Sequence, residues 1–151
     1  MLRHPRCLNC HTQTAFVRVG DDRRPHGMNV VRGPHNNGVP GMRCSSCHQK
    51  ENQALVGVPG ALHWQAAPLS MAWESMDDHD LARALLDPLK NGDRSLSDLT
   101  KHMKLDPLVL WSWDPGPGRA VPPVDHATFV RAFESWVDNG AVLPEPGQTT
   151  Y

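Results

Sequence analysis

The sequence predicts a mainly α-helical protein with extensive irregular loops. Residues 1–64 are dense in glycine, proline, asparagine and arginine, and only 15–19 shows a sustained helical or strand period. Residues 65–151 carry capped, amphipathic patterns that are typical of short helices. At this length the loop-rich segment 1–64 and the helical segment 65–151 are expected to form one compact domain.

The loop-rich segment contains three turn signals, at 25–27, 32–38 and 39–41. Glycine and asparagine there tolerate positive φ, and proline fixes φ near its turn value. So long an irregular stretch normally argues against a compact fold. Bonds to a bound metal or cofactor remove that objection, because they can organise a segment that has few backbone hydrogen bonds.

Two short helices are predicted in the first part of the helical segment. Each follows an aspartate or serine, whose side chain accepts hydrogen bonds from the first free N–H groups of a helix. The first covers 79–86 after Asp77 or Asp78, and the second runs from Ser95 or Ser97 to about Met103. Pro88 is expected to end the first helix.

A third and longer helix is predicted over 126–139. Asp125 precedes it as an N-cap, and Gly140 stands where a helix commonly ends in a left-handed residue. Its apolar side chains fall on one broad stripe, which can pack against a cofactor face or a partner helix.

A pentapeptide of the form Cys-x-x-Cys-His occurs twice and uses every cysteine of the chain. The copies are Cys7, Cys10 and His11, and Cys44, Cys47 and His48. This spacing is the attachment signature of c-type haem: two thiols add to the two vinyl groups, and the adjacent imidazole binds the iron. The sequence therefore predicts two covalently bound haem c groups, with His11 and His48 as proximal ligands.

A histidine or methionine elsewhere is expected to bind each iron from the opposite, distal side. For the first haem the nearest candidates along the chain are His26 and, behind it, His35. For the second haem, Met71 leads because a proline precedes it and a tryptophan follows it. His102 and His63 remain alternatives for the second haem. An axial methionine raises the reduction potential relative to histidine, so the distal choice affects function.

Composition supports a cofactor-filled core. Hydrophobic residues make up 39% of the chain, which is low for a globular domain of this length. Two buried porphyrins would supply the missing apolar surface. The formal net charge of −1 gives no reason to expect nucleic acid, and no apolar run is long enough to span a membrane.

The two motifs resemble those of dihaem c-type cytochromes, the exported electron carriers of bacteria. The closing segment 133–141 resembles the C-terminal helix of small c-type cytochromes. More loosely, 43–49, 63–73 and 106–111 are similar to proteobacterial dihaem proteins labelled isoquinoline 1-oxidoreductase subunits. These resemblances imply a small c-type cytochrome-like fold organised around two haems. The last one also implies service to a molybdenum hydroxylase.

The expected function is one-electron transfer in the periplasm. Redox proteins are the expected partners: a dehydrogenase or quinol-linked donor, and a later cytochrome or oxidase as acceptor. Haem is attached to this motif after export, so we expect a targeting segment to have been removed ahead of residue 1. No phosphate-binding glycine loop, His-Glu-x-x-His helix or serine elbow is present, so no catalytic residue is nominated.

Two other functions compete with the electron carrier. In a haem enzyme, peroxidase-like or sulfur-oxidising, one iron would keep an open position, and Arg32 or Arg43 could assist acid–base chemistry. In a zinc-binding module the four cysteines would hold metal without haem. The histidine that follows each cysteine pair favours haem over zinc.

Overall fold

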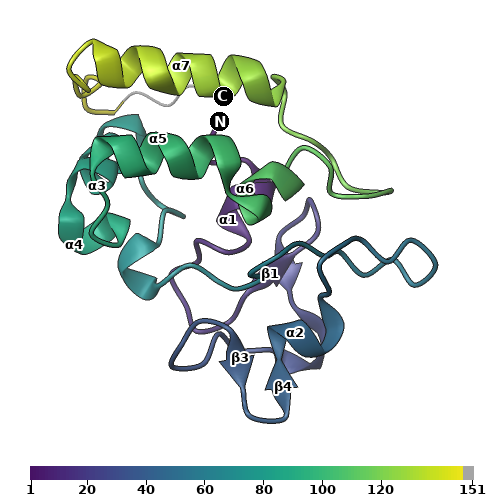
Figure 1. The fold of residues 1–151 in the computed structure, drawn as a ribbon. Coiled ribbons are helices and arrows are strands. Elements are labelled where there is room, and N and C mark those ends of the chain that lie inside the picture. Colours follow the sequence, from purple (N-terminus) through teal and green to yellow (C-terminus); the bar gives the residue numbers. More distant parts are fainter. Residues whose placement is uncertain (148–151) are drawn as a thin grey trace.

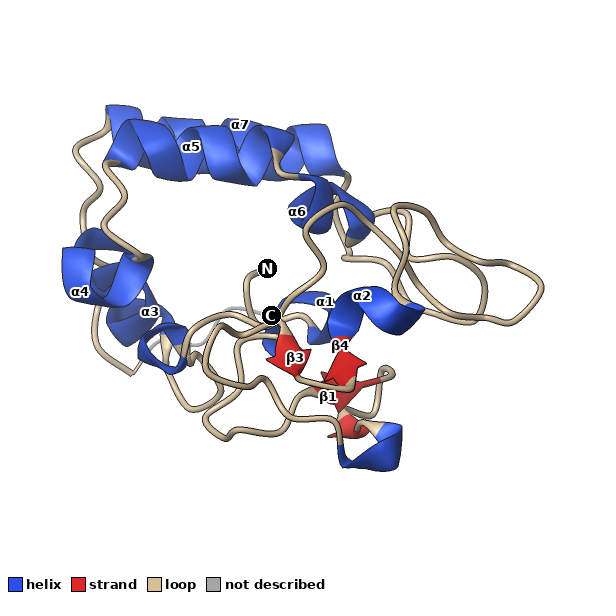
Figure 2. Ribbon diagram, turned by 60° about the horizontal axis from the view of Figure 1, so that its bottom comes forward, coloured by secondary structure: helices blue, strands red, loops and turns tan. Residues whose placement is uncertain are grey.

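The helices of the second half and the loops of the first half occupy opposite sides of the molecule (Figure 1). The structure is a computed structural model, and it describes residues 1–147. The helical half consists of α3 (Asp78–Leu86), α4 (Pro88–Asn91), α5 (Leu96–Leu105), α6 (Pro107–Trp111) and α7 (His126–Asp138). Helices α5 and α7 lie side by side, as both ribbon views show (Figures 1 and 2).

The three predicted helices are confirmed, together with their caps. The Asp77 side chain accepts a hydrogen bond from the Asp80 N–H at 2.8 Å, and the Asp125 side chain accepts one from the Thr128 N–H at 2.8 Å. Ser95, rather than Ser97, caps α5 in a reciprocal capping box with Asp98. These helix starts form locally because each depends on residues within one turn.

Helices α4 and α6 are short helices that the sequence analysis did not predict. Both begin with a proline at the first helical position, Pro88 and Pro107, directly after an aspartate N-cap. Proline is favoured there because its missing N–H would have no partner inside the helix. Pro88 therefore ends α3, as expected, and also begins α4.

The loop-rich half contains more regular structure than expected. Its elements are α1 (Pro5–Leu8), β1 (Arg18–Val19), β2 (Arg24–Pro25), β3 (Gly38–Val39), β4 (Met42–Arg43) and α2 (Cys44–Cys47). Single 3₁₀ turns lie at Gly27–Asn29 and, in the other half, at Leu69–Met71. The protein is thus a mixed structure of helices and short strands, and the prediction of a mainly α-helical chain is only partly confirmed.

Both strand pairs are antiparallel hairpins. Strand β1 pairs with β2, and β3 pairs with β4 with Gly38 opposite Arg43. Only Pro40 and Gly41 connect β3 to β4, and Gly41 has a φ of 80°. The turn signal at 39–41 therefore produces a hairpin, which places α2 directly after β4.

The hydrophobic core belongs almost entirely to the helical half. Leu8 is its one fully buried member from the first half. The cluster comprises Leu8, Trp73, Leu81, Leu85, Leu99, Met103, Phe129, Val130 and Phe133. The first half thus buries little apolar surface of its own, in line with the thin protein core inferred from composition.

Polar contacts from Arg32 organise part of the first half instead. The Arg32 guanidinium is buried and donates to the Thr12 hydroxyl at 2.7 Å and to the carbonyls of Thr14 and Ala67. Arg43, the other arginine considered for acid–base chemistry, donates to Asn37 at 2.7 Å. None of the helices among residues 1–147 is long and apolar enough to cross a lipid bilayer.

Candidate haem sites

Each Cys-x-x-Cys-His motif forms a single helical turn. In the first, the N–H groups of Cys10 and His11 both donate to the Cys7 carbonyl at 3.1 Å. In the second, the His48 N–H donates to the Cys44 carbonyl at 2.9 Å. Residues i, i+3 and i+4 of a helical turn share a face, so each motif presents two thiols and one imidazole together.

The two motif histidines are held in the same way. The His11 Nδ1 lies 2.7 Å from the Met71 carbonyl oxygen, and the His48 Nδ1 lies 2.7 Å from the Pro59 carbonyl oxygen. Because a carbonyl can only accept, each Nδ1 carries the proton and donates. The Nε2 of the neutral ring then keeps its lone pair for a metal.

A tryptophan stacks on each of these imidazoles. Trp73 lies on His11 with ring centres 3.4 Å apart, and Trp64 lies on His48 with ring centres 4.3 Å apart. The interplanar angles are 12° and 5°. One carbonyl and one indole together fix the rotation of each imidazole, which sets the direction of its Nε2.

The first motif opens into a cavity of about 240 Å³ between α1, the 3₁₀ turn at Leu69–Met71, and helices α5 and α6. Cys7, Cys10 and His11 line it, and His102 of α5 lines it as well. His11 and His102 lie close enough to affect each other. Burial is the main cause that lowers the pKa of His11 to about 4, and the positive charge of His102 also lowers it. The first cavity therefore holds a second imidazole.

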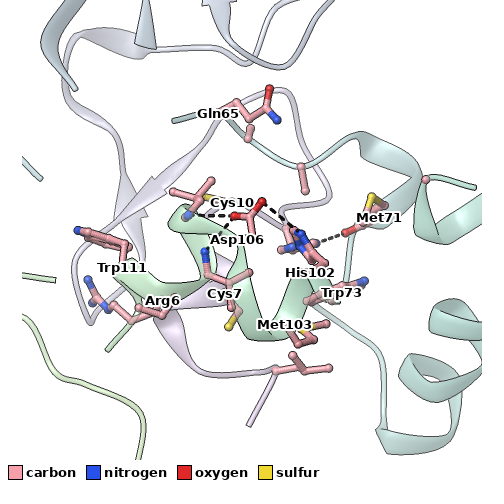
Figure 3. Close-up of a pocket in the computed structure, with 18 of the residues that line it drawn as sticks. Arg6, Cys7, Cys10, Gln65, Met71, Trp73, His102, Met103, Asp106 and Trp111 are labelled. Carbon is pink, nitrogen blue, oxygen red and sulfur yellow. Dashed lines mark hydrogen bonds and ion pairs between the residues drawn. The ribbon is translucent and has the colours of Figure 1, made fainter. Parts of the chain in front are cut away.

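Asp106 orients the His102 imidazole. Its Oδ2 lies 3.3 Å from the His102 Nδ1, one helical turn away (Figure 3). Partial burial is the largest single influence and acts against ionisation of Asp106, but the hydrogen bond and charge of His102, together with the N–H groups of Val109 and Leu108, outweigh it, so the pKa of this carboxyl is lowered. A carboxylate on the far nitrogen of a metal-binding histidine fixes the tautomer and increases its basicity.

The second motif opens into a larger cavity, of about 680 Å³, lined by Cys44, Cys47 and His48. His26 lines the same cavity from the loop after β2. Its Nδ1 lies 2.9 Å from the Gly27 carbonyl oxygen, so its Nε2 is also the ring nitrogen left for a metal.

The separation of His26 and His48 suits a shared metal ion. Their ring centres are 6.1 Å apart and the rings are inclined by 74°. A metal–imidazole bond is about 2 Å long, so two imidazoles on opposite sides of one ion have ring centres roughly 6 Å apart. The pair therefore has the spacing of two axial ligands.

The structure redistributes the distal candidates between the two sites. His26, expected opposite His11, lies against His48 instead, because the β1–β2 hairpin carries it to the second cavity. Met71, expected at the second haem, lines the first cavity, where its carbonyl anchors His11. His102, an alternative for the second haem, also lines the first cavity. His35 and His63 are exposed and line neither cavity.

Burial differs between the thiols of the two motifs: Cys7, Cys10 and Cys44 are partly buried, and Cys47 is exposed. Burial raises the pKa of the Cys7 thiol to about 12 and that of Cys10 to about 11. Burial also lowers the pKa of His48. Burial thus favours the neutral forms of Cys7, Cys10 and His48, which would suit an apolar cofactor.

The two cavities share a wall. Arg6, Cys10, Gln65, Ala66 and Trp111 line both of them. Cys10 thus belongs to the first Cys-x-x-Cys-His motif and also borders the second cavity. Groups bound at the two motifs would be separated by little more than these side chains.

The side chains around each cavity can be compared with the donor sets of haem and of zinc. Among residues 1–147, nowhere do three or more histidine, cysteine, aspartate or glutamate side chains gather as they would around a metal ion held by protein alone. A c-type haem would need two thiols and two imidazoles, and two of each line both the first and the second cavity.

Sequence reasoning missed several contributors to these sites. The carbonyls of Met71 and Pro59 leave no signal in side-chain patterns. Asp106 lies four residues after His102, so its spacing on a helix could have identified it.

Comparison with known proteins adds no assignment: a scan against protein-family models, a search of curated proteins and a search of solved structures each gave no match.

Proposed function

We propose that this protein is a dihaem c-type electron carrier in which two histidines hold each iron. His11 and His102 serve the first haem, and His48 and His26 serve the second. Cys7, Cys10, Cys44 and Cys47 attach the two groups. The observation that carries the proposal is the 6.1 Å separation of the His26 and His48 rings across the cavity beside the second motif.

Two histidines on each iron favour an electron carrier over an enzyme. Haem supplies a one-electron couple, and axial ligation together with the surrounding polarity sets its potential. With both axial positions taken by protein, no coordination position is left for a substrate. The arginines considered for acid–base chemistry support the same choice, because Arg32 and Arg43 are engaged in hydrogen bonds within the fold.

The chain's own residues orient the ligands and exclude water. Carbonyl contacts and stacked tryptophans fix the rotation of His11 and His48. The Asp106 carboxylate accepts a hydrogen bond from the Nδ1–H of His102, which would leave the His102 Nε2 as the nitrogen for a metal. A ligand shell that is rigid in both oxidation states keeps the reorganisation that accompanies electron transfer small.

The proposed setting is the periplasm, because haem attachment to this motif follows export. Redox proteins are the proposed partners: a dehydrogenase or quinol-linked donor, and a later cytochrome or oxidase as acceptor. The similarity to isoquinoline 1-oxidoreductase subunits makes a molybdenum hydroxylase the first donor to assay.

The test is a set of absorption and electron paramagnetic resonance spectra of the protein, produced with a periplasmic leader and the haem-attachment machinery. We expect two haems per chain. The oxidised protein should give low-spin ferric signals in electron paramagnetic resonance, and the reduced protein should give the absorption bands of low-spin ferrous haem. The near-infrared absorption spectrum should contain no methionine-to-iron charge-transfer band. Carbon monoxide should not bind the reduced native protein at equilibrium.

Other outcomes would select a different function. A high-spin signal with carbon monoxide binding would favour the haem enzyme. A methionine charge-transfer band would overturn the histidine pairing while leaving an electron carrier. A colourless protein that contains zinc would overturn the haem proposal altogether.

A further inference from the structure

Arg6 is a buried cation at the wall that the two cavities share. Only 1% of its side chain is exposed, and it lines both cavities. Its guanidinium carbon lies 5.8 Å from the centre of the Trp111 ring, and Figure 3 shows the two side chains on the wall of the first cavity. Arginine remains charged in proteins, so this wall carries a fixed positive charge.

The hydrogen-bonding capacity of Arg6 is largely unused. Among residues 1–147 its side chain has one acceptor, the carboxylate of Asp21, which bonds to one terminal nitrogen. The buried Nε–H has no partner. Asp21 is itself about half exposed, with a side-chain exposure of 46%, so water screens part of its compensating charge.

Arg32, also buried in the loop-rich half, has all of its donors paired. Its nitrogens donate to Thr12, Thr14 and Ala67, and none is left without a partner. A buried donor on a charged group is costly to leave unsatisfied. Arg23 also has a buried Nε–H without a partner, but only Arg6 of the two lines the cavities, so its guanidinium has spare donors where an anion could enter.

We propose that Arg6 binds a carboxylate of the bound haem groups and acts as an electrostatic element common to both sites, raising both reduction potentials. The anion is a propionate, since it is the acidic substituent that haem carries and the planar guanidinium matches a carboxylate. This inference rests on the proposed function. A positive charge nearby stabilises the reduced state, which carries one more electron, so Arg6 favours reduction at both irons.

The test combines two substitutions that change the charge beside the cavities in opposite directions. Arg6→Gln removes the positive charge, and Asp21→Asn removes its counter-charge while keeping an oxygen that can accept from the Ala120 N–H. Optical redox titration of the holo-protein should resolve two one-electron steps. We expect both potentials to fall in Arg6→Gln, by roughly tenfold in each reduction equilibrium constant, or about 59 mV. Both should rise in Asp21→Asn.

Arg131→Gln is the matched control. Arg131 is exposed on α7 and lines neither cavity. Removal of this solvated charge should leave both potentials close to their native values, because water and salt screen it. Arg6→Lys keeps the charge and should likewise stay near native, which provides a second test if Arg6→Gln does not fold.

Three results would overturn the inference. Unchanged potentials in Arg6→Gln would mean that its charge does not reach the irons. A shift at one iron alone would make Arg6 part of a single site. Shifts of the same sign in Arg6→Gln and Asp21→Asn would indicate a structural disturbance. Failure of the proposed function would look different, because a protein without haem bands has no potentials to titrate.

Discussion

His26 and His48 line one cavity with their ring centres 6.1 Å apart, although one follows strand β2 and the other follows helix α2. The β1–β2 hairpin and the turn that joins β3 to β4 bring them together. Because each ring has its Nδ1 committed to a backbone carbonyl, each keeps its Nε2 for a metal.

Replacement of His26 should therefore open one iron and leave the other unchanged. In His26→Gly we expect the second site to become high-spin and to bind carbon monoxide when reduced, at one equivalent per chain. His35→Gly is the matched control, since His35 is an exposed loop histidine that lines neither cavity. Carbon monoxide binding by the control, or its absence in His26→Gly, would contradict the pairing.

Asp106→Asn should weaken His102 as a ligand without unfolding helix α6. Asparagine still caps a helix but loses the carboxylate charge that strengthens the imidazole. Loss of such a contact typically weakens ligation by about 10–100-fold, so a high-spin fraction should appear at the first site. Low-temperature electron paramagnetic resonance measures it. Asp87→Asn, the same change at the N-cap of α4, should leave the spectrum native.

Stability should decline in acid because capping carboxylates must be ionised. The pKa of Asp98 is lowered by the Ser95 hydroxyl, that of Asp125 by the Thr128 hydroxyl, and that of Asp77 by the Asp80 N–H. A lowered folded-state pKa means that the unfolded chain binds more protons. This contribution is complete above an unfolded-state pKa of about 4 and disappears as the pH falls through the lower folded values.

Urea unfolding midpoints measured between pH 6 and pH 2 would check this dependence. Replacement of all three aspartates by asparagine preserves the caps but removes their titration. The triple variant should show a flatter decline below about pH 4 than the native chain. An identical decline in both proteins would assign the acid sensitivity to other groups.

Asn91 should be a large single contributor to the stability of the helical half. It is 2% exposed; its amide donates to the carbonyls of Leu85 and Arg94, and its oxygen accepts from the Arg94 N–H. Asn91→Ala leaves three backbone groups without partners, so we expect the free energy of unfolding to fall by about 3 kcal/mol. Asn139→Ala, an exposed counterpart, should cost less than about 1 kcal/mol.

Local interactions explain which features could be predicted from the sequence. The N-caps at Asp77, Ser95 and Asp125 act within one helical turn, so their helices were predicted correctly. The common face of two cysteines and a histidine follows from a single turn as well. The glycine and proline of 39–41 likewise specify their own tight turn.

Which histidines lie near the motif histidines depends on contacts between distant segments, and the structure places them differently from the pairing predicted by proximity along the chain. His26 is nearer to His11 in sequence, but the hairpin pairing carries it to His48. His102 reaches the first cavity because α5 packs with α6 and α7 over α1. The sequence by itself determined the two Cys-x-x-Cys-His motifs and the capped helices, since these depend on neighbouring residues. Only the tertiary structure decided which imidazoles share a cavity and that Arg6 borders both cavities, because these arrangements depend on how the two halves pack.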